Sequence, residues 1–264
     1  MITLFDLTYR VAALLGAVIE GTATGGSTTT TIDTARIEAD DSWNGGTLWV
    51  VSAGGTAPEG EYAVISDFVS TTHTITHTAL TAAIAAGDSY AISKKRFPLW
   101  LLKQKINAVV RKHRITQIDT SLTSADSQTE YSLPSGIIDV REVWLQNKID
   151  SDDNRWEKLY DWRVQAVSGG YVLVLPQLDS GYTIKTVYTK EHENLVTADD
   201  ILDDSIPPER VLYEAAKECL VWRKQRGDPS VNQLINYFSD LADNAAQTFP
   251  MKTPHRTSRL LIVR

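Results

Sequence analysis

The chain has 264 residues, 42% of them hydrophobic and 22% charged, with a formal net charge of -7 and a pI near 5.3. This apolar content suffices for a sizeable core, whereas the mild acidity argues against a general nucleic-acid binder, which would be strongly basic. The single cysteine, Cys219, excludes an intramolecular disulfide and a cysteine-ligated zinc site. We expect a soluble protein made in a cytosol, because the N-terminus lacks the basic region of a signal peptide and no apolar run approaches the ~18 residues of a membrane span.

A helix is predicted from the N-terminus to Gly21. Thr3 and Asp6 have the spacing of a capping box. The apolar residues after them fall at helical spacing: Leu4, Leu7, Val11, Leu14, Leu15 and Val18. Residues 22–31 are almost entirely Thr, Gly and Ser, and this composition predicts a flexible hinge.

Residues 32–93 have the pattern of an all-β module. Short runs rich in Thr and Val alternate with turn signals such as Asn44-Gly45-Gly46 and Gly54-Gly55. Turns at this spacing predict a small sandwich or barrel. Arg36 is the only Lys or Arg between residues 22 and 93, so the module is acidic.

The charge reverses in the next segment, where Lys94 to Arg114 contains no acid. Pro98 suits the first turn of a helix. An apolar stripe then predicts an amphipathic helix: Leu99, Leu102, Ile106, Val109 and Val110. The bases beside it are a candidate functional face: Lys103, Lys105, Arg111, Lys112 and Arg114.

Uncompensated bases on one face repel one another, so we expect an acidic group against this candidate face. Three partners stay open: the phosphates of double-stranded DNA, the acidic loops of the chain itself, or the acidic face of a neighbouring copy. A solvated helix face is the plain alternative.

The remainder combines a β-rich middle with two closing helices. Strands are predicted at residues 137–145, 171–175 and 182–188. The first closing helix begins near Pro207 and Pro208 and ends at Gly227; Asp228 then caps the second, and Pro229 opens it. Its apolar face would be Val211, Leu212, Ala215, Ala216, Cys219 and Leu220, and that of the second helix Val231, Leu234, Ile235, Phe238, Leu241, Ala242 and Ala245.

These elements together predict an α+β fold with a four-helix bundle core, a β-rich middle and an inserted small all-β module. Residues 1–21 and 94–249 would form the helical domain with its β-rich middle. Residues 22–93 would be the insertion, and residues 250–264 a C-terminal arm.

The C-terminal segment 250–264 contains bases but no acid and too little apolar surface to fold alone. It is either a frayed terminus or an arm that docks on another subunit, and its apolar and basic ending favours the arm. The candidate docking residues are Pro250, Lys252, Pro254, Arg256, Arg259, Leu260, Leu261, Ile262, Val263 and Arg264.

No constellation in the sequence favours catalysis. His73 and His77 lack the glutamate of the HExxH motif and fall in a predicted strand, where surface histidines are the simpler interpretation. The acidic runs 150–153 and 199–204 lack calcium-loop spacing. Cys219 lies on an apolar helical stripe, as a core residue would. We therefore expect no enzyme, no metal and no cofactor.

The order of elements resembles the head-to-tail connector adaptor proteins of tailed bacteriophages. The resemblance rests on Tyr131-Ser-Leu-Pro134, the strand Val140 to Leu145, the pair Val187-Tyr188, and the Asp-rich approach to Ile206-Pro207 before paired closing helices. Residues 39–49, with 60–62 and 86–90, also resemble small β modules that recur in phage virion proteins.

This resemblance implies a structural protein of the virion neck, assembled in the host cytoplasm. It implies a dodecameric ring of this chain beneath the portal protein, a C-terminal arm that docks on the portal, tail or neck proteins as further partners, and a lumen that conducts DNA during packaging and ejection. The large β insertion departs from the plain helical adaptor.

Two other roles stay open at this stage. One is a tail-terminator or other neck protein of the same particle. The other is a virion module that binds a receptor or glycan through Trp43 and Trp49 of the β insertion, which would require exposed aromatic side chains on one face.

Overall fold

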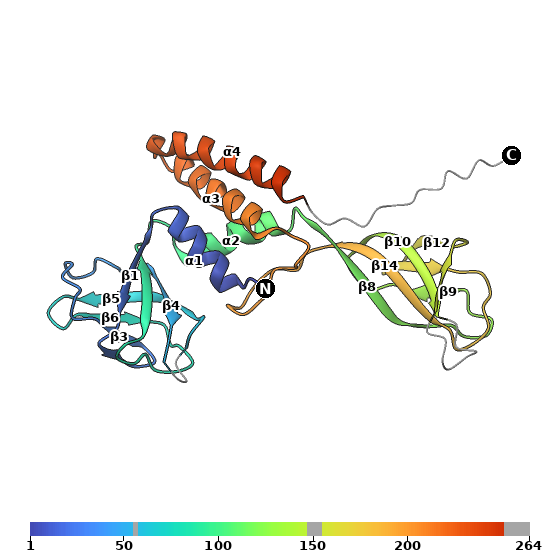
Figure 1. Cartoon of the computed structure of the whole chain (residues 1–264), viewed down its shortest axis with the longest axis horizontal. Helices are drawn as coiled ribbons and strands as arrows, with labels where there is room; N and C mark the ends of the chain where they lie inside the picture. Colours follow the sequence, from blue (N-terminus) through green and yellow to red (C-terminus); the bar gives the residue numbers. More distant parts are fainter. Residues whose placement is uncertain (55–57, 147–154, 251–264) are drawn as a thin grey trace. The chain divides into compact units, whose positions relative to one another are not determined.

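The computed structural model describes residues 1–54, 58–146 and 155–250. Contacts divide the chain into two units, the first formed by Met1–Val110 with the described residues from Asn194 onward, and the second by Arg111–Glu193 (Figure 1). Of the described residues, 26% are helical and 34% are in strands. This division follows contacts and not origin, so an inserted module at residues 22–93 stays a prediction.

The first unit contains one antiparallel sheet of seven strands, in the order β1-β7-β4-β5-β6-β3-β2 (Figure 1). The strands are β1 (Val18–Thr22), β2 (Gly25–Gly26), β3 (Thr30–Ile32), β4 (Thr47–Ser52), β5 (Tyr62–Val69), β6 (Thr74–His77) and β7 (Ser89–Ser93). Alternate residues of β5 and β6, among them Ile65, Phe68 and Ile75, point into a core that also buries Trp43.

A buried polar network ties β1 and β7 to the segment that follows β3. The Tyr90 hydroxyl donates to Asp33 at 2.6 Å, and Arg36 Nε donates to the Tyr90 oxygen at 2.9 Å. Arg36 also donates to the carbonyl of Glu20 at 2.6 Å and lies 3.3 Å from the Asp33 carboxylate. Burial raises the pKa of Tyr90, and the hydrogen bond to Asp33 raises it further. Every buried polar group of this network has a partner, as burial requires.

Four α-helices complete the first unit: α1 (Leu4–Leu14), α2 (Leu99–Val110), α3 (Pro208–Gln225) and α4 (Asn232–Thr248), with the 3₁₀ turn η1 (Pro229–Val231) before α4. Helix α3 packs against each of the other three, and α1 also packs against α2. The predicted stripe of α3 is buried in full, including Val211, Ala215 and Cys219. The predicted stripe of α2 is buried as well.

The predicted four-helix bundle core is wrong, because strands predominate in the described chain and the helices share no closed bundle core. Helices α1, α2 and α3 pack together, whereas α4 packs along α3 and η1. Helix α4 buries only Phe238, Ala242 and Ala245, while Leu234, which its apolar pattern placed inward, is 49% exposed. Two of its three buried residues are alanines, which add little apolar area to a shared core.

Two predictions for the N-terminal segment are also wrong. The first helix ends at Leu14 and not at Gly21, because Gly16 adopts a positive φ of 62°, a common way to end a helix. Residues 22–31, predicted as a flexible hinge, contain β2 and the start of β3. The Thr3–Asp6 capping box, in contrast, is present as predicted.

The second unit is entirely β in its described part. Its four-stranded sheet has the order β11-β10-β14-β8, and its three-stranded sheet the order β12-β13-β9. The strands are β8 (Arg114–Thr123), β9 (Glu130–Ser132), β10 (Ile137–Gln146), β11 (Trp156–Leu159), β12 (Arg163–Val167), β13 (Gly170–Val174) and β14 (Thr183–Glu191). Both sheets supply residues to one core, which includes Tyr131, Val143, Leu173 and Ile184.

The Arg36 network predicts that Gly21 cannot be replaced without cost. A Cβ at this position would overlap the Arg36 guanidinium and would lie 2.8 Å from both Asp33 Oδ2 and Tyr90 Cζ. We expect Gly21→Ala to lower the free energy of unfolding by about 1–3 kcal/mol, as measured by urea denaturation. Gly25→Ala is the matched control, since no atom lies within 4 Å of its added Cβ. Equal effects of the two substitutions would contradict the network's role.

A second prediction concerns Asp228, which caps η1 by accepting from the backbone N–H of Ser230 at 3.2 Å. Hydrogen bonds from Ser230 and then from Arg223 lower the pKa of Asp228 to about 2. A carboxylate with a depressed pKa stabilises the fold above its unfolded pKa of about 4, and this contribution is lost as the pH falls through about 2.

We therefore expect Asp228→Asn, which keeps a capping oxygen but removes the charge, to lower the urea midpoint at pH 6. The difference from the unmodified chain should shrink between pH 4 and pH 2. Asp240→Asn, at an exposed position on α4, is the control and should leave the midpoint nearly unchanged. A difference between Asp228→Asn and the unmodified chain that stayed constant down to pH 2 would rule out this assignment.

Candidate assembly surfaces

The candidate basic face predicted between Lys94 and Arg114 is divided between the two units. Helix α2 ends at Val110, so Lys103 and Lys105 belong to the first unit. Arg111, Lys112 and Arg114 belong to the second unit, where Arg114 is the first residue of β8. The five bases therefore do not lie on one helix.

Several of these bases interact with the chain itself. The Lys103 ammonium donates to the carbonyl of Val196 at 2.5 Å and lies 5.4 Å from the centre of the Tyr62 ring. Burial lowers the pKa of Lys103. Lys105 lies 3.9 Å from the Glu218 carboxylate. These contacts supply, within the chain, part of the compensation that the sequence left open.

The bases of the second unit are more exposed. Arg111 lies 3.5 Å from Glu191, and both side chains are more than half exposed. Such a surface ion pair contributes little to stability. Lys112 and Arg114 are also exposed, so this end of β8 presents bases to solvent.

The structure brings together a basic and aromatic cluster that the sequence analysis missed. We call it the tryptophan cluster and define it by Arg96, Trp100, Trp222, Lys224 and Arg226. The two indole rings meet edge to face with centroids 5.9 Å apart, and the Arg226 guanidinium lies 4.3 Å from the centre of the Trp222 ring. Trp100 is 55% exposed although it is a large aromatic residue. Its members come from segments more than 100 residues apart, so no local pattern indicates the cluster.

Asp228 lies beside this cluster and accepts from two of the neighbouring arginines. The distance is 2.9 Å from Arg223 and 3.4 Å from Arg96. One carboxylate thus faces several bases, which include Lys224 and Arg226 at exposed positions. The cluster keeps an excess of positive charge.

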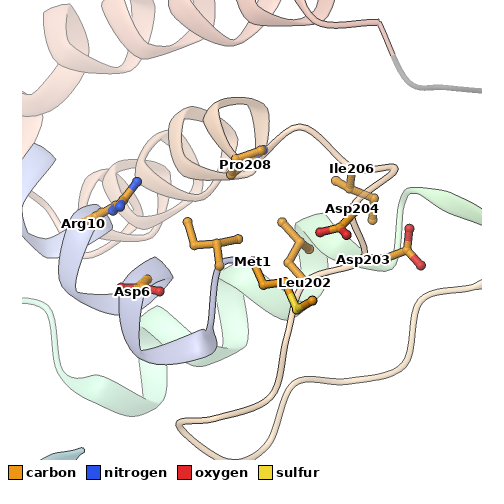
Figure 2. A pocket seen from close by; sticks show the side chains of 9 residues that line it. Met1, Asp6, Arg10, Leu202, Asp203, Asp204, Ile206 and Pro208 are labelled. Carbon is orange, nitrogen blue, oxygen red and sulfur yellow. The ribbon is translucent and has the colours of Figure 1, made fainter. Parts of the chain in front are cut away.

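A hollow lies at the other end of α3, where the chain enters that helix (Figure 2). It has a volume of about 260 Å³ and opens to solvent. Its lining is Met1, Ile2, Asp6, Arg10, Leu202, Asp203, Asp204, Ile206 and Pro208. The apolar side chains of Met1, Leu202 and Ile206 lie among three carboxylates and one base, so the hollow is apolar inside with an acidic surround (Figure 2).

The carboxylates around the hollow have defined roles in the backbone. Asp6 accepts from the backbone N–H of Thr3 at 3.0 Å, which caps α1. Asp203 accepts from the backbone N–H of Ser205 at 2.9 Å. Asp204 is exposed at the rim. The hollow is smaller than the ~300–1,000 Å³ of a typical small-molecule site, and its size suits one large side chain.

The histidines and the cysteine that the sequence analysis considered are bonded to protein or buried. His77 Nε2 lies 3.1 Å from the Thr31 hydroxyl, and burial lowers the pKa of His77. His73 Nδ1 lies 2.6 Å from the carbonyl of Arg36. Burial raises the pKa of the Cys219 thiol to about 12, which makes it a poor nucleophile. The described residues contain no group of three or more His, Cys, Asp or Glu that could hold a metal.

The aromatic residues proposed to grip a receptor or glycan are not on the surface. Trp43 is 1% exposed and Trp49 is fully buried, and the Trp49 indole N–H donates to the Thr8 hydroxyl at 3.2 Å. Both belong to the core of the first unit. The structure therefore gives no support to a binding face at these two residues.

The candidate C-terminal arm lies almost wholly outside the described residues. Only Pro250 is described, and it is exposed. Among the described helices, none combines the length and the apolar character needed to cross a membrane.

Comparison with known proteins places the chain in a family. Residues 98–261 match the family described as SU10 adaptor protein. The match covers more than half of the chain and begins at Pro98, after the seven-stranded sheet. The comparison with curated proteins found no match. The chain belongs to the SU10 adaptor protein family, a family of phage adaptors, and is a structural component of the virion.

Proposed function

We propose that this chain forms the adaptor ring between the portal and the tail, with a lumen that conducts DNA during packaging and ejection. The observation that carries the proposal is the family match over residues 98–261, which includes α2, the whole second unit and the paired helices α3 and α4. Partners of the ring would be the portal protein, tail or neck proteins, and further copies of this chain in a dodecamer. No step of this role requires catalysis or a cofactor.

The C-terminal arm 250–264 is the proposed attachment to the portal. It contains four Lys or Arg, no acid and the apolar run Leu260–Val263, and the family match extends into it as far as residue 261. An arm that orders on its partner binds weakly for its area, but a ring presents the same arm many times. Repetition around the axis raises the overall avidity without a strong single contact.

DNA contact would be non-specific and electrostatic. Arg111, Lys112 and Arg114 are exposed bases at the start of the second unit, and bases of this kind bind phosphates with an affinity that falls with salt. The net charge of -7 fits a conduit better than a tight DNA binder, because a strongly basic lumen would hold the DNA that it has to release.

Deletion of residues 250–264 tests the attachment to the portal. We expect the truncated chain to lose co-purification with the portal protein at least tenfold, since the arm supplies the proposed contacts. Binding should be measured by pull-down on immobilised portal, with the circular dichroism spectrum as a check that the described fold is kept. A control variant reverses two charges outside the arm, Arg163→Glu with Arg114→Glu, and should bind the portal as the unmodified chain does.

Undiminished portal binding by the truncated chain would contradict the docking role of the arm. It would leave the family assignment in place, because that assignment rests on residues 98–261 as a whole.

A further inference from the structure

The tryptophan cluster and the hollow lie at opposite ends of α3. The hollow includes Pro208, the first residue of the helix, and the cluster includes Trp222, in its last turn. A helix rises 1.5 Å per residue, so these two positions are about 20 Å apart. Helix α2 runs antiparallel beside α3, because Trp100 contacts Trp222 while Lys105 contacts Glu218. The two surfaces therefore cannot meet within one copy.

Their charges are opposite. The cluster contains Arg96, Lys224 and Arg226, with Lys94 and Lys95 just before it in the chain. The hollow has Asp6, Asp203 and Asp204 against Arg10 alone. The helix dipole accounts for acids at the start of α3 and bases at its end, but it does not account for Asp6 on α1 or for Arg96 before α2. The opposition extends over several elements.

Their shapes are complementary as well. The cluster presents an indole that is 55% exposed and is held in place by a second ring. The hollow offers about 260 Å³ lined in part by Met1, Leu202 and Ile206. An aromatic anchor in an apolar pocket, surrounded by charged groups, is the arrangement found at the centres of strong protein interfaces. Arginine and tryptophan are the residue types most enriched there.

We propose that the tryptophan cluster of one copy docks in the hollow of the next copy, with the Trp100 indole inserted between Met1, Leu202 and Ile206. This contact is heterologous, because two different surfaces meet, and repetition of a heterologous contact closes a ring when the rotation allows it. The inference rests on the proposed ring and names the contact between its subunits. It involves residues before Pro98 as well as residues of the family match.

Disulfide trapping tests the contact directly. In the full chain carrying Trp100→Cys and Asp204→Cys, we expect oxidation to give a ladder of covalent oligomers on a non-reducing gel. The same bond cannot form within one copy, because a disulfide requires Cα atoms less than ~7 Å apart and the two positions are separated by the length of α3. The native Cys219 does not compete, since it is buried.

The matched control replaces Trp100 by another exposed aromatic residue. Tyr237 on α4 is 56% exposed, so Tyr237→Cys with Asp204→Cys has equal access to oxidant but lies outside the cluster. We expect only scattered dimers from this pair. Trapping should be carried out with the free chain at high concentration and with the chain bound to the portal. A ladder no stronger than the control in both samples overturns the proposal.

Charge reversal provides a second, independent test. Lys224→Glu with Arg226→Glu makes the cluster end acidic, and Asp204→Lys makes the hollow less acidic. Each variant alone should weaken self-association at least tenfold in sedimentation experiments. A one-to-one mixture should recover much of it, because each altered surface then meets a complementary one. Failure of the mixture to exceed both single variants would argue against this pairing.

The arm is the competing occupant of the hollow. If the free chain lacking residues 250–264 no longer gives the ladder, the arm and not Trp100 fills the hollow, and the proposal is overturned. Loss of portal binding with an intact ladder would instead separate the two claims, since the portal contact and the contact between copies would then depend on different residues.

Discussion

The burial of one stripe of α3 is the interaction on which the helical part of the first unit depends. Val211, Ala215 and Cys219 lie on this stripe and are fully buried, and α3 packs against each of α1, α2 and α4. A helix of 18 residues is also a rigid spacer. It sets the separation of the acidic hollow and the tryptophan cluster, and a contact between copies that uses both ends requires this separation to be constant.

Local signals in the sequence predicted the parts of the fold that local interactions determine. The Thr3–Asp6 capping box, the Asp228 cap and the buried stripe of α3 are present as expected, because each depends on residues within one or two turns. The same reasoning missed the end of the first helix at Gly16, since the apolar pattern continues into β1. There, alternate residues of a strand have replaced the helical stripe, and pairing with β7 determines the outcome.

Non-local pairing explains the other errors. The Thr-rich segment after Gly21 has the composition of a linker, yet β2 and β3 pair at the edge of the sheet. Gly21 is needed for the close approach of Arg36 and Tyr90 and not for flexibility. The basic stretch was predicted as one face, but α2 ends at Val110 and distributes its bases over two units. The tryptophan cluster could not be predicted, because it joins the start of α2 to the end of α3.

The asymmetry of the first unit bears on how copies could associate. Surfaces that must pair with themselves in a two-fold dimer would bring base against base at the cluster, or acid against acid at the hollow, and like charges in contact are unfavourable. Head-to-tail contact avoids this repulsion. At physiological ionic strength, charges are screened over about 8 Å, so the charges can orient the approaching copies but the buried indole has to supply the lasting part of the contact. The affinity of one contact can then stay low, because ring closure adds the others.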